Sequence, residues 1–325
     1  MMSSTTTATE IASVSYKAKA APTVQSLPAT ASIEEITSAL ALAGGVILRK
    51  AVSGDTLDKI EQEVRPLLLH DSPWVGTFFP AQTRRAYGML GVSALYAREI
   101  VMHPVFQAVS KKFLIKKHWF WEGLNKQWAV SKPQLSNTIV FSIGAGASAQ
   151  PLHRDDSIHQ WIPEAIETYP TDLSSRDASV GFFVAAKKAT KANGATRFIP
   201  GSHLWGHETP PDESLCQWAE MEKGDAFLML ASCFHGGSAN TTADEERLIF
   251  SSFMTRGTLR QEENQYLAVE KEKMKILDVD IQQTAGYSLS EPFLGWVEST
   301  DPRMVLDPQI KGSSDMWTGT EEPEI

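Results

Sequence analysis

Between Gln134 and Met254 the sequence repeats one pattern, in which a short apolar run is followed by a turn rich in glycine or proline. Runs of this length between such turns are typical of buried strands. A succession of short strands favours a double-sheet jelly roll, also called a double-stranded β-helix. We therefore predict a mainly β fold with a cupin-like core. The expected strands are Thr138–Ile143, Val180–Ala185, Thr196–Ile199, Ala226–Leu230 and Leu248–Met254.

Helical patterns flank this core on both sides. Ser32 and Glu35 form a capping-box pattern ahead of a first helix, which Gly44-Gly45 should end before a buried strand at 46–48. Pro66 should kink the next helix or end it early. The further expected helices are 55–69, 93–130 and 261–277. The core should thus carry N-terminal and C-terminal helices packed on its outside.

The order of these patterns predicts a single domain over 32–306. The residues before it, 1–31, are rich in Ser, Thr and Ala and are expected to be a disordered tail, with a weak organelle-targeting segment as the alternative. Residues 307–325 are expected to be a loose polar tail. Two segments without a clear period, Asp71–Tyr87 and Ser157–Arg176, are candidate lids over a binding site.

Charge and cysteine content exclude several classes of function. The formal net charge is −9, and the lysines and arginines form short clusters rather than a continuous stripe. Nucleic acid is therefore not an expected partner, because its phosphates need concentrated positive charge. Two cysteines are too few for a disulfide framework, and no apolar run is long enough to span a bilayer. We expect a cytoplasmic protein without a membrane span.

One motif in the predicted sheet carries metal-binding chemistry. His153 and Asp155 form the only His-x-Asp or His-x-Glu pattern in the chain. In a strand these two side chains would point to the same face. An imidazole and a carboxylate on one face suit a first-row metal such as iron(II), and a third ligand from a distant strand would complete a 2-His-1-carboxylate triad. The alternative is a surface turn with a solvated histidine and aspartate.

Three features downstream support the metal-site interpretation. His235 lies beside Gly236-Gly237, and glycines let backbone or a ligand approach closely. Arg247 stands at the head of a predicted strand, where it could pair with a carboxylate through two hydrogen bonds. Thr196 lies between the His-x-Asp motif and His235 in the sequence, and its hydroxyl could reach a co-substrate oxygen.

The order of these motifs resembles the phytanoyl-CoA hydroxylase-like family of iron(II)/2-oxoglutarate dioxygenases, and is most similar to its fungal branch that tailors meroterpenoids and alkaloids. The resemblance rests on His153-x-Asp155, Asn193-Gly194 with Pro200-Gly201-Ser202-His203, His235-Gly236-Gly237 and Arg247. It implies that His153, Asp155 and His235 bind iron(II). It also implies that Arg247 binds the distal carboxylate of 2-oxoglutarate, with Gln150 and Thr196 as further polar partners.

The resemblance implies that 2-oxoglutarate and O₂ are co-substrates, that ascorbate serves as reductant, and that the chain forms a homodimer. The expected reaction is oxidation of an apolar polycyclic small molecule by C–H abstraction, with hydroxylation, desaturation, rearrangement or endoperoxidation as the outcome. Asp155 argues against halogenation, because related halogenases lack that carboxylate. The alternatives are an acyl-CoA 2-hydroxylase, which the acidic balance disfavours, and a catalytically silent jelly roll that binds a small molecule or a partner subunit.

Other residues near the motifs have weaker expectations. Asp156 is the rival carboxylate, but it should point to the opposite face, and His203 should be structural. His159 could line the substrate entrance, and Cys233 is close enough in sequence to His235 to meet oxidants formed there. An apolar substrate wall is expected from aromatic residues, or these rings are simply core. The aromatic residues are Phe78, Phe79, Tyr87, Trp119 and Trp121.

Overall fold

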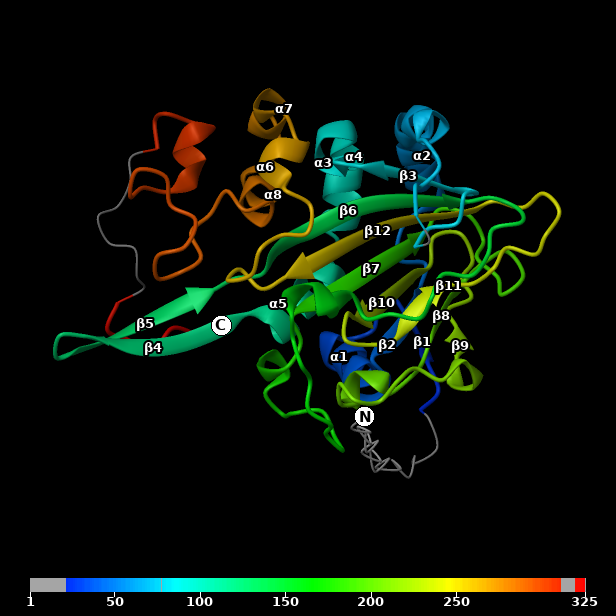
Figure 1. Ribbon diagram of the computed structural model, residues 1–325. Coiled ribbons are helices and arrows are strands. Elements are labelled where there is room, and N and C mark those ends of the chain that lie inside the picture. Colours follow the sequence, from blue (N-terminus) through cyan, green and yellow to red (C-terminus); the bar gives the residue numbers. More distant parts are fainter. Residues whose placement is uncertain (1–21, 77, 311–318, 325) are drawn as a thin grey trace, which may run out of the picture.

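A computed structural model describes residues 22–76, 78–310 and 319–324, and its centre is a large, mostly antiparallel sheet facing a small one (Figure 1). The large sheet has the strand order β1-β2-β10-β7-β12-β6-β3, and the small sheet has the order β11-β8-β9. These two sheets form the predicted jelly roll. Their strands are β1 (Gln25–Pro28), β2 (Gly45–Arg49), β3 (Thr83–Tyr87), β6 (Gln134–Ile143), β7 (Ser179–Ala185), β8 (Thr196–Phe198), β9 (Gln217–Trp218), β10 (Ala226–Leu230), β11 (His235–Gly237) and β12 (Arg247–Thr255).

Alternating side chains give the large sheet two apolar faces. In β7, Phe182 packs in the core on the helical side, whereas Phe183 packs toward the small sheet. In β10, Leu228 likewise packs on the helical side and Met229 packs toward the small sheet. Because successive residues of a strand point to opposite faces, near-continuous apolar runs are required when both faces are covered. Full burial of a side chain such as Phe182 stabilises the fold by roughly 2–3 kcal/mol.

Helices cover the outer face of the large sheet, as predicted. The capping box at Ser32 and Glu35 is formed, and Gly44 ends the first helix in the left-handed region at φ 76°. Residues of α1, α2 and α5 share the outer core with the strands. The helices are α1 (Ile33–Ala43), α2 (Gly54–His70), α3 (Met89–Val92), α4 (Ala94–Tyr96), α5 (Pro104–Leu114), α6 (Gln265–Ala268), α7 (Lys271–Lys275) and α8 (Val279–Thr284). The shorter turns are the π-helix η1 (Ala97–Val101) and the 3-10 helices η2 (Asp155–His159), η3 (Leu173–Ser175), η4 (Ser202–Leu204), η5 (Glu213–Leu215) and η6 (Pro302–Val305).

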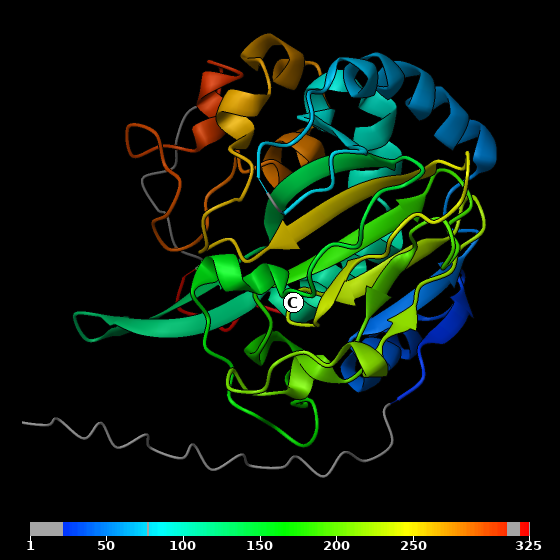
Figure 2. The same cartoon turned by 45° about the vertical axis from the view of Figure 1, so that its right-hand side comes forward.

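The predicted helix over 93–130 is wrong in its second half. After α5 the chain forms a two-stranded hairpin, β4 (Lys116–Glu122) and β5 (Asn125–Ser131), which extends from the side of the large sheet (Figures 1 and 2). Gly123 makes the turn at φ 59°, a left-handed conformation that glycine adopts without strain. Trp119 and Trp121 are exposed on this hairpin, so they belong neither to the core nor to a binding cavity.

Three further expectations are corrected. The helix containing Pro66 does not end early, since α2 continues to His70 with Val64 and Leu68 both buried on one side of it. The expected loop 71–87 ends in the edge strand β3, which pairs with β6. Residues 261–277 form only two short helices, α6 and α7, rather than one continuous helix. No helix within the described ranges has the length and apolarity that crossing a bilayer requires.

The expected tails are also shorter than predicted. Residues 1–21 lie outside the described residues, but 25–28 form β1, which pairs in parallel with β2. At the other end, Gly319 pairs with Trp128 of the hairpin, and Glu322 forms an ion pair with Lys117 at 2.7 Å. Each of these short segments is held by backbone pairing to an existing strand, a signal that composition alone does not carry.

Candidate metal centre and co-substrate site

The predicted ligands His153, Asp155 and His235 come together between the two sheets. His153 and His235 form an isolated antiparallel bridge, with both backbone N–H···O distances at 2.9 Å. The prediction that Asp155 continues a strand is wrong, because this residue begins the 3-10 helix η2. The turn brings its carboxylate back toward both imidazoles. The convergence of the three side chains is therefore as expected, although the local backbone is different.

The three side chains have the geometry of a metal site. One ligand atom from each lies within 4.8 Å of the others. Asp155 Oδ1 is 3.3 Å from His153 Nε2, and its Oδ2 is 3.2 Å from His235 Nε2. Two imidazole nitrogens and one carboxylate oxygen on one side of a metal form the facial triad used for non-haem iron(II), which leaves positions open for other ligands.

Backbone carbonyls orient both histidines for metal binding. His153 Nδ1 lies 2.8 Å from the Pro151 carbonyl, and His235 Nδ1 lies 3.1 Å from the Cys233 carbonyl. A carbonyl can only accept, so each Nδ1 carries the proton and donates it. The Nε2 lone pairs are then directed at the triad. This second hydrogen bond is the usual way in which proteins fix the tautomer of a metal-binding histidine.

The electrostatics of the triad match a cation site. Burial raises the pKa of Asp155, but the positive charge and hydrogen bonds of the two histidines prevail and hold it well below its usual range. Burial lowers the pKa of His153, but the hydrogen bond and charge of Asp155 outweigh that effect and the net change is upward. In the protein alone, a proton on His153 thus supplies part of the positive charge that a metal ion would bring to Asp155.

Asp156 is not a fourth ligand. Its side chain is buried, and burial followed by the charge of Asp177 raises its pKa to about 7. It lies outside the group of atoms that could hold a metal. The choice of Asp155 over Asp156 therefore agrees with the geometry.

Arg247 is a buried cation beside the triad without a counter-ion. It is 4% exposed at the head of β12, and its Nη2 donates to the Thr196 hydroxyl at 2.7 Å. Its Nε has no hydrogen-bond partner among the described residues, and no described carboxylate forms an ion pair with it. Burial lowers its pKa to about 10. A buried guanidinium without a counter-ion lowers the stability of the fold unless an anionic ligand pairs with it.

Gln150 lies in the same site, but both its side chain and its backbone form hydrogen bonds with Gly237. Its side-chain oxygen accepts from the Gly237 N–H at 3.3 Å, and its backbone N–H donates to the Gly237 carbonyl at 2.9 Å. Gln150 thus joins the segment before His153 to strand β11. Thr196, with its hydroxyl on Arg247, is better placed than Gln150 to contact a ligand held by that arginine.

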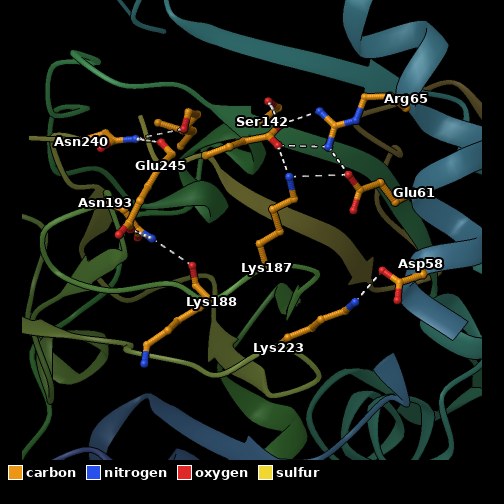
Figure 3. A network of polar contacts seen from close by, with 12 residues as sticks. Asp58, Glu61, Arg65, Ser142, Lys187, Lys188, Asn193, Lys223, Asn240 and Glu245 are labelled. Carbon is orange, nitrogen blue, oxygen red and sulfur yellow. Dashed lines mark hydrogen bonds and ion pairs between the residues drawn. The ribbon is translucent and has the colours of Figure 1, made fainter. Parts of the chain in front are cut away.

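A polar network on the molecular surface holds the residues that precede Arg247. Glu246 accepts from Arg65 of α2 at 2.6 Å, from Lys187 at 2.5 Å, and from the hydroxyl of Ser142. Figure 3 shows how Arg65, Lys187 and Ser142 converge there. The side chain of Asn193, from the Asn-Gly motif, donates to Glu245 at 2.9 Å. This motif is therefore structural, because it fixes the loop from which Arg247 enters the sheet.

The triad and Arg247 line one cavity of about 360 Å³. This volume is at the lower end of the range for small-molecule sites. Its apolar wall comes from the large sheet, from the segment before β3 and from η2. The apolar residues are Phe78, Phe79, Pro80, Ile139, Phe141, Ile143, Ile158, Phe183 and Phe253.

The cavity tests the weaker expectations. Both candidate lids contribute to it, the first with Phe78 and Phe79 and the second with Ser157 and Ile158. His159 and Tyr87 do not line it. The His159 ring instead lies 3.3 Å from the Thr255 hydroxyl. The 3-10 turn explains the difference for His159, because it directs Ser157 and Ile158 inward instead.

His203 and Cys233 have no part in the cavity. His203 is buried, its Nε2 lies 3.0 Å from the Ala41 carbonyl, and burial lowers its pKa to about 4, so its role is structural as predicted. Cys233 is fully buried, and burial raises the pKa of its thiol to about 12. The expectation that Cys233 meets oxidants formed at the metal is wrong, because its thiol faces the core beside Ala43.

Sequence reasoning missed three charged or amide side chains of the cavity. Arg154 lies between two ligands but turns away, donating to the Ser202 and Trp205 carbonyls at 2.9 and 3.2 Å and stacking over a phenylalanine ring. Asn137 follows from the alternation of β6, in which 137, 139, 141 and 143 all line the cavity. Glu262 lies in the loop after β12, where no sequence pattern marks it.

Comparison with known proteins places these features in a family. The phytanoyl-CoA dioxygenase family profile matches residues 40–248. The dioxygenase himG of Aspergillus japonicus is 38% identical over 290 residues, covering 86% of this chain and 88% of the relative. The dioxygenase cnsJ of Penicillium expansum is 37% identical over 287 residues, covering 86% and 85%.

A solved structure supports the fold. HygX from Streptomyces hygroscopicus, with nickel and 2-oxoglutarate bound, superposes with a TM-score of 0.52 at 15% sequence identity, over 71% of this chain and 90% of that one. With the profile matched over more than half of the chain and relatives above 30% identity matched over most of their length, the chain belongs to the phytanoyl-CoA dioxygenase family.

Proposed function

We propose that this dioxygenase binds iron(II) through His153, Asp155 and His235, and 2-oxoglutarate through Arg247. Family membership makes the chain an oxidoreductase of the dioxygenase class. The observation that carries the co-substrate assignment is Arg247, a buried cation with an unpaired Nε in the cavity of a His-Asp-His triad. A dicarboxylate can meet both groups at once, one end at the metal and the other at the guanidinium.

Each residue then has a defined task. Each imidazole offers the lone pair of a neutral Nε2 to the metal, because its proton is on Nδ1, where a backbone carbonyl accepts it. Asp155 supplies negative charge, and Arg247, oriented by Thr196, binds the distal carboxylate. Iron(II) together with 2-oxoglutarate and O₂ supplies the oxidant that removes hydrogen from a substrate C–H bond. For hydroxylation the balance is substrate, 2-oxoglutarate and O₂ to hydroxylated substrate, succinate and CO₂.

The aromatic wall supports an apolar polycyclic substrate. Phe79, Phe141 and Phe253 line the cavity together with the triad and offer apolar surface to a substrate. An acyl-CoA would instead need exposed cations at the cavity mouth for its phosphates. The arginines that line the cavity, Arg154 and Arg247, are both buried and engaged with other groups. Hydroxylation, desaturation, rearrangement and endoperoxidation are all compatible outcomes. A homodimer, a cytoplasmic location and ascorbate as reductant stay predictions.

The test is an anaerobic titration of the protein with iron(II) and 2-oxoglutarate, followed by the visible metal-to-ligand charge-transfer absorbance. We expect the band in the wild type and in His207→Ala, which alters an exposed histidine. His235→Ala should lack it. A wild type that develops no band would overturn the metal and co-substrate assignment, and would favour a catalytically silent jelly roll.

A further inference from the structure

One charged group of the cavity has no task in the proposed reaction. Among the described residues that line the cavity, the charged side chains are Arg154, Asp155, Arg247 and Glu262. Asp155 belongs to the metal triad, Arg247 faces the co-substrate, and Arg154 turns to backbone carbonyls. Glu262 is left over, so its carboxylate is available to the substrate.

The position of Glu262 is fixed from β6. The side-chain amide of Asn137 donates to its carboxylate, and the Glu262 backbone N–H donates to the Ser136 hydroxyl at 3.3 Å. Asn137 is only 3% exposed, whereas the Glu262 side chain lines the cavity with part of its surface open to solvent. The amide therefore orients one carboxylate oxygen and leaves the other free to accept a hydrogen bond.

No described cation neutralises this carboxylate. The ion pairs of the described residues do not include Glu262. Burial first, and then the negative charge of Asp155, raise its pKa above the ordinary value. Its anion is thus destabilised in the protein alone, which is the opposite of what a structural salt bridge would produce. A positively charged ligand would reverse that effect.

Aromatic side chains line the same cavity as the carboxylate. Ile139 and Phe141 follow Asn137 on the same face of β6, and Phe79 packs against Phe141 with ring centroids 5.8 Å apart. Phe253 lines the cavity from β12. Faces of aromatic rings attract cations, most strongly where water is excluded. A cavity that offers both a carboxylate and phenylalanine rings is thus suited to an organic ammonium group attached to an apolar body.

We propose that the substrate carries a protonated amine, and that Glu262, oriented by Asn137, pairs with it and determines specificity. This inference rests on the proposed function, since it concerns the substrate of the same site. The amine would donate a hydrogen bond to the free carboxylate oxygen, while the apolar part of the molecule fills the space between the phenylalanine walls.

The experiment compares two probes of the same shape, tryptamine and its neutral counterpart tryptophol. Affinities are measured by ligand-observed NMR on the zinc(II)-loaded protein with 2-oxoglutarate, where no turnover occurs. In the wild type, tryptamine should bind about ten-fold more tightly than tryptophol, as expected for a charge-assisted pair beside aromatic rings. Glu262→Gln keeps the size of the side chain and an acceptor for Asn137, and should reduce the preference to about two-fold or less.

Two further variants sharpen the result. Glu270→Gln removes the same charge at an exposed position outside the cavity, and should keep the full preference. Glu262→Lys should reverse it, so that indole-3-propionate binds better than tryptamine. The proposal is overturned by equal affinities in the wild type, by a preference that survives Glu262→Gln, or by no tryptamine binding at millimolar concentration. The iron charge-transfer band does not involve Glu262, so its presence or absence separates failure here from failure of the proposed function.

Discussion

His153 and His235 are paired through their backbones, each donating its N–H to the carbonyl of the other at 2.9 Å. The two imidazole rings lie side by side as a result, with centroids 4.5 Å apart. Two ligands that are distant in sequence are thus held by backbone geometry rather than by side-chain packing alone. The metal site should therefore be sensitive to changes in the backbone next to this bridge.

Gly236→Ala should weaken metal binding. A Cβ at this position would lie 3.0 Å from the backbone oxygens of Gln150 and Pro151, which cannot move without shifting His153. We expect metal affinity to fall by about 10- to 100-fold, the range seen when the support of metal ligands is disturbed. Competition between the protein and a chelator for zinc(II) or cobalt(II) measures it. Gly54→Ala is the control, because its Cβ would have no neighbour closer than 3.7 Å.

Arg247→Met should stabilise the protein alone and abolish its response to 2-oxoglutarate. The substitution removes a buried charge that lacks a counter-ion, which should raise the free energy of unfolding by about 1–3 kcal/mol. Urea unfolding with and without 2-oxoglutarate measures both effects, since ligand binding to the wild type adds stability. Arg98→Met, which alters an exposed arginine paired with Asp278, should do neither. A destabilised Arg247→Met protein would contradict the view that this charge is uncompensated.

Thr196→Val should weaken 2-oxoglutarate binding by about ten-fold, the cost of one lost hydrogen bond to a charged group. The hydroxyl of Thr196 orients the Arg247 guanidinium at 2.7 Å, and valine has the same shape without an acceptor. Thr196→Ser retains the hydroxyl and should bind normally. Anaerobic titration of the charge-transfer band gives the dissociation constants. Equal affinities for Val and Ser would mean that Thr196 only fills space.

Glu246→Gln should destabilise the protein in a pH-dependent way. Burial raises the pKa of Glu246, but hydrogen bonds from Arg65, Lys187 and Ser142 prevail and lower it to about 2. Its stabilising contribution is therefore present above the unfolded-state pKa of about 4.3 and is lost as the pH falls toward 2. We expect a loss of about 1–2 kcal/mol at pH 7 that shrinks below pH 4. Urea unfolding at pH 7, 5 and 3 follows the difference, with the exposed Glu272→Gln as control.

The core strands were predictable because their patterns are local and strong. Ala226–Leu230 has the predicted bounds, and the strand beginning at Arg247 places that residue as expected. The hairpin at 116–131 was missed because alternating aromatics over a short stretch also satisfy a helical spacing. Its turn at Gly123 was the only opposing signal. Burial would have decided between the two structures, but burial is not visible in the sequence.

The site was predictable only where motif and chemistry coincide. His153, Asp155 and His235 have side chains with few other uses in such a pattern, whereas Glu262 is one of many acidic residues in the chain. Its role depends on Asn137, which is 125 residues away and contacts it through the fold. Even for Asp155 the predicted backbone was wrong, since a 3-10 turn rather than a strand directs its carboxylate. A prediction that three side chains converge can thus be right even when the predicted backbone conformation of one of them is wrong.

Part of the cavity wall comes from segments of the chain that carry none of the reactive groups. The triad and Arg247 are attached to the backbone bridge and to the start of β12, whereas Phe79 and Glu262 stand on connecting segments before β3 and after β12. Mutations in those segments can thus remodel substrate choice at little cost to the oxidising centre. This separation favours the evolution of new substrate specificities, because substitutions in the connecting segments leave the metal ligands and Arg247 unchanged.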